Sequence, residues 1–220
     1  ATATPGGGAL SALAGIGQAP ASLAVSPTPG SFGARVVVSA GDPVVFAVRN
    51  GGELSTGVLS AMLAGPDAVA FEVVGDTCSG VSLAAMAMCT VSVRFAPTTA
   101  GAKVASLAVG ASPGGATAAA LSGTGLTPAQ IAIAPTARNF GAVVVGAPSG
   151  STTFTVTNVG EAATGAPSAS LTGADAGQFE IVSSTCAGSL AAGASCTVAV
   201  RFAPTSAGTR AAALRGRASP

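Results

Sequence analysis

Apolar and polar residues alternate along several short segments of this 220-residue chain. In residues 44–50 (VVFAVRN) and 153–158 (TFTVTN) every second side chain is apolar, which is the period of a β-strand with one buried face. Further short strands are expected at residues 22–27, 58–63, 71–74, 89–95, 104–109, 116–124 and 131–135. No segment shows the 3.6-residue period and the capping residues of a surface helix. The pattern therefore predicts an all-β chain.

Residues 89–101 (CTVSVRFAPTTAG) return 107 residues later as residues 196–208 (CTVAVRFAPTSAG), with eleven of the thirteen positions identical. In both segments the valines and the Phe face one side of the predicted strand, and the Arg faces the other. The chain therefore contains two copies of one module, and about seven short strands per copy predict two β-sandwiches. The Phe residues divide into four per copy, and we expect all of them in the two cores: Phe32, Phe46, Phe71, Phe95, Phe140, Phe154, Phe179 and Phe202.

Several motifs follow one another in the same order in both copies: F-G, then a segment like TVTN-x-G-E, then F-E-[IV]-V, then C-x(9–10)-C-T-V-x-V-R-F-A-P-T-x-x-G. Together they resemble the Hydin-type immunoglobulin-like modules, also called choice-of-anchor domains, which occur in bacteria as tandem repeats in secreted and surface proteins. The resemblance covers nearly the whole chain. It implies seven-stranded immunoglobulin-like sandwiches that serve architecture or partner binding, and it implies no catalytic residues.

The sequence does not start and stop at equivalent positions of the two copies. Residues 6–28 align without a gap to residues 114–136, which hold the last strand of the first copy and the start of the second. The second copy stops at Pro220, which aligns with Pro113, before a last strand of its own. We therefore expect residues 1–17 to form an orphan strand, residues 18–125 a complete module, and residues 126–220 a module that lacks its last strand.

A sandwich without its last strand exposes an edge of unpaired backbone groups and a strip of core, to which another strand can be added. The linker at residues 18–22 reaches only about 14–17 Å, whereas a strand of seven or eight residues spans about 25 Å. The orphan strand is therefore expected to enter another copy rather than its own chain. Such a head-to-tail contact does not close, and it predicts a homopolymeric filament assembled by donor-strand exchange.

The residues expected to form this contact lie at the two ends of the chain. The expected donor strand is Gly8, Ala9, Leu10, Ser11, Ala12, Leu13, Ala14, Gly15, Ile16 and Gly17. The expected acceptor edge lies near Cys196, Val198, Val200, Phe202, Ala211 and Ala213.

Other functions are compatible with the same arrangement of the two modules. The chain could be a piece of a longer secreted or surface repeat protein in which the modules act as spacers or adhesion modules. A carbohydrate-binding module would usually expose Trp or Tyr, and the sequence contains neither. A passive spacer beside a catalytic domain outside this sequence is a further alternative.

Charge and composition argue against several classes of function. Only 8 % of the residues are charged, the net charge is +1 and there is no His. The chain therefore offers no basic surface for nucleic acid and lacks the most common acid–base residue of enzymes, so we expect neither an enzyme nor a cofactor. The longest apolar run, residues 81–93, is too short to span a membrane.

Carboxylate residues recur at equivalent positions in both copies, and we interpret them as solvated side chains or partners of ion pairs. No Asp-x-Asp cluster supports a cation site, so we expect no metal and interpret Glu53 and Glu161 as solvated side chains at strand ends. A cross-strand ion pair is expected between an Arg of the repeated VRF segment and the Glu of the F-E motif in each copy. These pairs are Glu72 with Arg94 and Glu180 with Arg201.

The four cysteines allow three disulfide pairings. Repeat symmetry favours Cys78 with Cys89 and Cys186 with Cys196, and the alternative is buried free thiols in a cytoplasmic protein. Zinc is excluded because the chain has no His and no CxxC spacing. The pairing predicts an oxidising compartment and therefore an extracellular or cell-surface protein.

Overall fold

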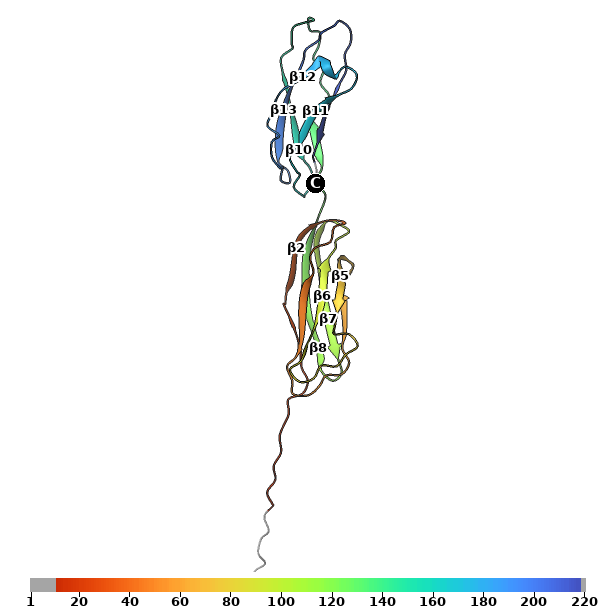
Figure 1. Ribbon diagram of the computed structural model, residues 1–220, viewed down its shortest axis with the longest axis vertical. Coiled ribbons are helices and arrows are strands. Elements are labelled where there is room, and N and C mark those ends of the chain that lie inside the picture. The colour runs from red at the N-terminus through yellow and green to blue at the C-terminus, as the bar shows by residue number, and fades with distance from the viewer. Residues whose placement is uncertain (1–10, 219–220) are drawn as a thin grey trace, which may run out of the picture.

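A computed structural model describes residues 11–218 and confirms an all-β chain that forms two sandwiches, placed end to end in Figure 1. The only helices among these residues are two single 3₁₀ turns, Ala68–Ala70 and Ala176–Gln178. No helix in this part of the chain has the length and hydropathy needed to cross a membrane.

The first sandwich contains eight strands, one more than the sequence predicts. They are β1 (Leu23–Ser26), β2 (Gly30–Val36), β3 (Val44–Asn50), β4 (Ser60–Ala64), β5 (Phe71–Asp76), β6 (Met88–Phe95), β7 (Gly101–Ala111) and β8 (Gly115–Leu126). One sheet has the order β1-β3-β6-β5 and the other the order β2-β8-β7-β4. This is the strand order of an immunoglobulin-like sandwich, with β8 as its last strand and the additional β2 running parallel to it.

The core of the first sandwich comes from the alternation in its strands. Phe46, Phe95 and Leu107 are fully buried between the two sheets, and Leu121 of β8 is 1 % exposed. β7 pairs with β8 over its whole length, from Gly101 opposite Gly125 to Ala111 opposite Gly115. The last strand therefore closes one side of this core.

The second sandwich repeats the first with six strands. They are β9 (Ile131–Ala134), β10 (Thr152–Asn158), β11 (Ser168–Thr172), β12 (Phe179–Ser184), β13 (Ser195–Phe202) and β14 (Ala213–Arg217). The sheet β12-β13-β10-β9 is complete, whereas the other sheet consists of β11 and β14 alone. Within the described residues, the second sandwich thus has no counterpart of β8 or β2.

The absence of a last strand also changes its neighbours. Residues 106–110 of β7 pair with β4, and their counterparts form β14, which pairs with β11. Residues 101–105 of β7 pair with β8 alone, and their counterparts, residues 208–212, form no strand. Residues 138–144, the counterparts of β2, are likewise irregular. Both segments lack the strand that would supply their hydrogen bonds.

Two disulfides, one per sandwich, confirm the pairing predicted by repeat symmetry. Cys78 bonds to Cys89 and Cys186 to Cys196, with S–S distances of 2.05 and 2.00 Å. All four cysteines are therefore oxidised, which removes the free-thiol alternative. Disulfides of this kind fit a secreted or periplasmic protein.

The predicted ion pairs are also present, and the Phe residues divide into two groups. Arg94 and Arg201 lie 2.7 Å from the carboxylates of Glu72 and Glu180, on partly exposed surfaces where such pairs contribute little to stability. Half of the Phe residues, Phe46, Phe71, Phe95 and Phe154, are buried. The other half, Phe32, Phe140, Phe179 and Phe202, are half-buried. The first three pack against the cores, and the ring of Phe202 lies 4.9 Å from that of Phe179.

Asn50 has a role that its sequence context does not reveal. The pair Asn50-Gly51 is a turn signal, yet Asn50 ends β3 with its side chain fully buried. Its Oδ1 accepts hydrogen bonds from the N–H groups of Ser22 and Gly52, and its Nδ2 donates to three carbonyl oxygens. Asn158 makes the equivalent five bonds in the second sandwich. Each Asn therefore holds the entering linker to the end of its sandwich.

Candidate strand-acceptor groove

An open groove of about 1020 Å³ runs along the second sandwich where the first sandwich holds β8. Its floor consists of core side chains from both sheets, among them Phe179, Phe202 and Leu214. Its rims are residues 137–142 on one side and residues 208–213 on the other, and of these only Ala213 pairs with another strand, β11. The groove is thus a strip of core with free backbone groups along both rims.

The exposure of equivalent side chains in the two sandwiches shows which core residues β8 covers in the first sandwich. Phe95 and Leu107 are 0 % exposed in the first sandwich. Their counterparts Phe202 and Leu214 are half-buried. In the first sandwich the covering side chains belong to β8, whose Ala119 and Leu121 are buried. A strand with small and aliphatic inward residues therefore fits the groove.

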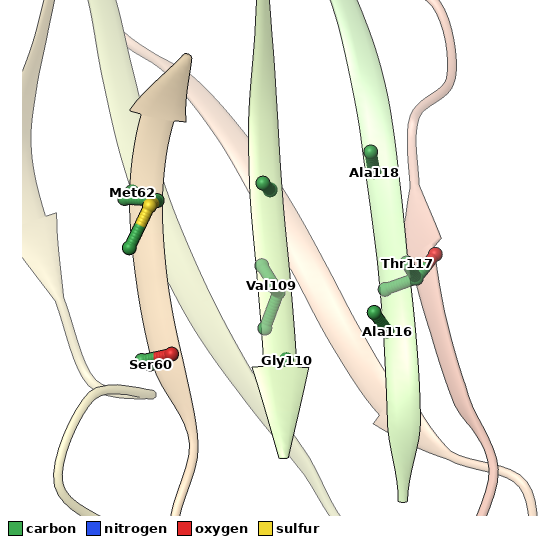
Figure 2. A pocket seen from close by; sticks show the side chains of 8 residues that line it. Ser60, Met62, Val109, Gly110, Ala116, Thr117 and Ala118 are labelled. Atoms are coloured by element: carbon green, nitrogen blue, oxygen red, sulfur yellow. The ribbon is translucent and has the colours of Figure 1, made fainter.

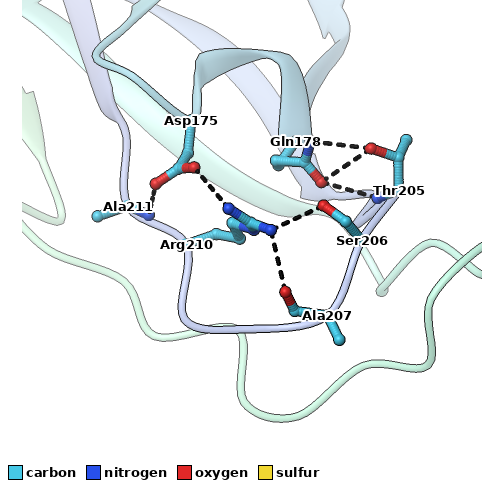
Figure 3. Close-up of polar contacts among 7 residues, drawn as sticks. All are labelled: Asp175, Gln178, Thr205, Ser206, Ala207, Arg210 and Ala211. Carbon is cyan, nitrogen blue, oxygen red and sulfur yellow. Dashed lines mark hydrogen bonds and ion pairs between the residues drawn. The ribbon is translucent and has the colours of Figure 1, made fainter.

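Polar contacts order the rim at residues 205–211, as Figure 3 shows. Asp175 accepts a hydrogen bond from the N–H of Ala211 (3.0 Å) and pairs with Arg210 (3.2 Å). Arg210 also donates to the Ser206 hydroxyl and the Ala207 carbonyl, at 2.7 and 3.0 Å. Asp67 makes the corresponding contacts with Val104 and Lys103 in the first sandwich. The rim therefore keeps its course without a strand beside it.

The pKa of Asp175 predicts how this rim responds to acid. The Ala211 N–H hydrogen bond has the largest effect and lowers the pKa of this carboxyl. Desolvation opposes it, and the hydrogen bond and positive charge of Arg210 add to the lowering, so the pKa lies below its ordinary value. Because the folded pKa is depressed, the contact stabilises the rim above the ordinary pKa of Asp and is lost as the pH falls through the folded value. We expect the Ala211 amide resonance to shift and its hydrogen exchange to accelerate in that acidic range.

The control for this titration is Asp175→Asn, which removes the carboxyl. The Ala211 amide should then show no transition in the acidic range. A transition that persists in the Asn variant would contradict the assignment to Asp175.

The described part of the expected donor strand is extended and contacts no strand of its own chain. Residues 11–20 have no regular structure and lead away from the end of the first sandwich that is opposite to the second sandwich (Figure 1). Leu13 and Ile16 are 95 and 93 % exposed. Gly8, Ala9 and Leu10 lie outside the described residues.

The linkers that enter the two sandwiches dock in the same way. Glu53 accepts a hydrogen bond from the Ala19 N–H (2.7 Å), and its own N–H donates to the Ala19 carbonyl. Glu161 accepts from the Thr127 N–H (2.7 Å), and its N–H donates to the Thr127 hydroxyl. The recurring Glu residues thus hold linkers, and no cluster of metal-ligating residues occurs between residues 11 and 218.

The acceptor edge predicted from the sequence needs a correction. Cys196, Val198 and Val200 belong to β13, which pairs with β10 on one side and β12 on the other, so β13 is not an edge. Val200 and Phe202 contribute side chains to the floor of the groove, and Ala211 and Ala213 lie on its rim. The open edge is that of β14. The alignment of the two copies identifies the same edge. Residues 208–212 correspond to residues 101–105, and residues 101–105 pair with β8 alone.

A second surface lies on the outer face of the first sandwich (Figure 2). It is shallow, and its lining from β4, β7 and β8 is small and uncharged, with Met62 as its largest side chain. No polar groups converge on it. It therefore does not have the form of a small-ligand site.

The chain matches no protein-family model and no curated protein sequence. It is similar in structure to the ASH/PapD-like domain 7 of human CEP192, with 15 % identity and a TM-score of 0.39 over 56 % of this chain and 99 % of that one. It is also similar to the secreted serine protease VesC from Vibrio cholerae, with 15 % identity and a TM-score of 0.38 over 90 and 51 % of the two chains. A third similar structure is the E. coli chaperone DraB, with 11 % identity and a TM-score of 0.35 over 81 % of this chain and 84 % of that one.

These values limit what the similarities imply. This chain spans about half the length of VesC. All three TM-scores are below 0.5, so no function is transferred from these proteins. The description of the sandwiches as immunoglobulin-like follows from their own strand order.

Proposed function

We propose that this chain is a structural subunit of an extracellular bacterial filament, in which residues 8–17 of one copy complete the second sandwich of the next. The observation that carries the proposal is the open groove in the second sandwich, in a chain whose residues 11–17 are exposed and align with residues 119–125 of β8. Strand addition satisfies the backbone groups of both rims and covers the exposed core strip. The function is architectural and needs no catalysis or cofactor.

The direction of the strands supports a linear assembly. In the first sandwich β8 runs antiparallel to β7 and leads into the second sandwich. The end of β14 lies on the side of the second sandwich that faces the first (Figure 1). A donated strand antiparallel to β14 therefore leaves the groove at the far end of the molecule. The copy that donates it continues the long axis.

The linker contacts support the same assembly. Residues 19–21 dock on the first sandwich in the way that residues 127–129 dock on the second. The junction between two copies therefore has the same construction as the junction within one copy. The same contacts also favour the second candidate, a spacer in a longer array of Hydin-type or choice-of-anchor modules, where one covalent chain supplies every last strand.

Electron microscopy of negatively stained protein tests the proposal. We expect the full chain to form long beaded fibres and a variant lacking residues 1–17 to form two-bead particles. An excess of a peptide with the sequence of residues 8–17 should shorten the fibres by occupying free grooves. A full chain that stays a two-bead particle at all concentrations would overturn the filament and leave the spacer function.

A further inference from the structure

We infer that the donated strand binds in a single register, with Leu13, Gly15 and Gly17 facing the groove. This inference rests on the proposed function and adds the residues that determine its specificity. The strand then runs antiparallel to β14 and parallel to residues 138–144, as β8 runs relative to β7 and β2. In the alignment, Leu13, Gly15 and Gly17 take the places of Leu121, Gly123 and Gly125.

The first glycine avoids an aromatic ring. A Cβ on Gly123 would lie 2.8 Å from two atoms of the Phe95 ring, and this ring is fully buried and cannot move aside. Phe202 is the counterpart of Phe95 and lies in the floor of the groove. Gly15 is therefore the donor residue that fits over Phe202.

The second glycine avoids backbone. A Cβ on Gly125 would collide with the Thr99 carbonyl oxygen and lie 3.2 Å from the Pro97 ring. The second sandwich carries Ser206 and Pro204 at these positions, within the ordered rim described above. Gly17 meets this requirement.

The leucine fills the space between the two sheets. Leu121 is 1 % exposed and pairs in register with Ala105. The counterpart of Ala105 is Ala212, on the rim of the groove. Leu13 is 95 % exposed in the free chain, so its burial contributes to binding.

Other registers place side chains where glycine is required. A slip of one residue turns the opposite face inward and brings Ala14 or Ile16 onto Phe202. A slip of two residues puts Leu13 onto Phe202, or puts Ala19 at the place of Gly125. In the inferred register Ala14 and Ile16 face solvent, as Ser122 and Thr124 do in β8.

Disulfide trapping in the full chain tests the register, because the four native cysteines are already paired. The inferred register places Ala12 opposite Ala213 and Ala14 opposite Ala211, by analogy with Ala120 opposite Ser106 and Ser122 opposite Val104. Directly opposite residues lie within disulfide distance, whereas diagonal ones do not. We expect the double variants Ala12→Cys/Ala213→Cys and Ala14→Cys/Ala211→Cys to give ladders of covalent multimers on oxidation.

The diagonal variant Ala14→Cys/Ala213→Cys is the matched control and should give no ladder. A ladder from this variant alone, in protein that still forms fibres, would overturn the register and leave the proposed function intact. Neither ladders nor fibres from any variant would overturn both.

Assembly measurements test the glycine requirement. A Cβ on Gly15 meets nothing within 4 Å in the free chain, so Gly15→Ala leaves the fold of the subunit unchanged. We expect this variant to raise the protein concentration needed for fibre formation about 10-fold or more, because of overpacking against Phe202. Gly188→Ala, at an exposed glycine outside the donor strand where a Cβ also meets nothing within 4 Å, should leave that concentration unchanged. Equal effects of the two variants would overturn the assignment of Gly15.

Discussion

Replacement of Asn50 by alanine is expected to destabilise the first sandwich by about 3 kcal/mol or more. The substitution removes five hydrogen bonds and leaves two N–H groups and three carbonyl oxygens without their partner. Each buried polar group left unsatisfied costs about 1–3 kcal/mol, although water can reach those nearest the surface. Chemical denaturation, followed by hydrogen exchange in each sandwich, measures the loss.

Two further variants serve as comparisons for Asn50→Ala. Asn158→Ala should destabilise the second sandwich by a similar amount, because Asn158 makes the same five contacts. Asn139→Ala should cost less than about 1 kcal/mol, since Asn139 is exposed and accepts one hydrogen bond, from Gly141. A loss at Asn50 no larger than that at Asn139 would refute the role given to Asn50.

The second large expected effect is a difference in the loss of stability between two equivalent Phe positions. Phe95→Ala is expected to destabilise the first sandwich by about 3–5 kcal/mol, whereas Phe202→Ala should destabilise the second by about half as much. Phe95 is fully buried under β8, and Phe202 is half-buried beside the open groove. Hydrogen exchange of residues 89–101 and 196–208 measures both losses within nearly identical sequence surroundings.

Strand addition changes this comparison. When the peptide of residues 8–17 occupies the groove, Phe202 becomes as buried as Phe95, and the cost of Phe202→Ala should rise toward that of Phe95→Ala. Equal losses at the two positions without peptide would mean that the groove is already filled in the free chain.

The sequence predicts much of this fold because the alternation of side chains and the internal repeat are both strong signals. The strand at residues 44–50, the disulfide pairs and the Glu72–Arg94 contact all follow from period-two alternation and from the comparison of the two copies. The comparison of the copies also predicts that the described second sandwich has no counterpart of β8. These features depend on residue type and order alone.

Other features depend on tertiary context and were missed. β2 (GSFGARV) is a strand because β8 lies beside it, and the equivalent residues 138–144 form no strand where β8 is absent. A second difference is Arg138, which replaces Gly30, a residue whose Cβ would collide with the Phe46 ring. The role of Asn50 does not follow from its sequence, because an Asn-Gly pair is typical of turns and does not show that this Asn is fully buried. The predicted acceptor edge included Ala211 and Ala213, which lie on the open rim, but also Cys196, Val198 and Val200 of the central strand β13, because the sequence does not show which strand ends at the edge.

The way in which β8 leads into the next linker determines how the molecule carries tension. Pulling along the long axis loads β8 lengthwise against β7 and β2, so that the hydrogen bonds of the whole strand resist together in shear rather than separating one after another. A donated strand in the second sandwich would be loaded in the same direction. The mechanical strength of such a noncovalent junction would then be limited by the rate of strand extraction rather than by the affinity of the strand.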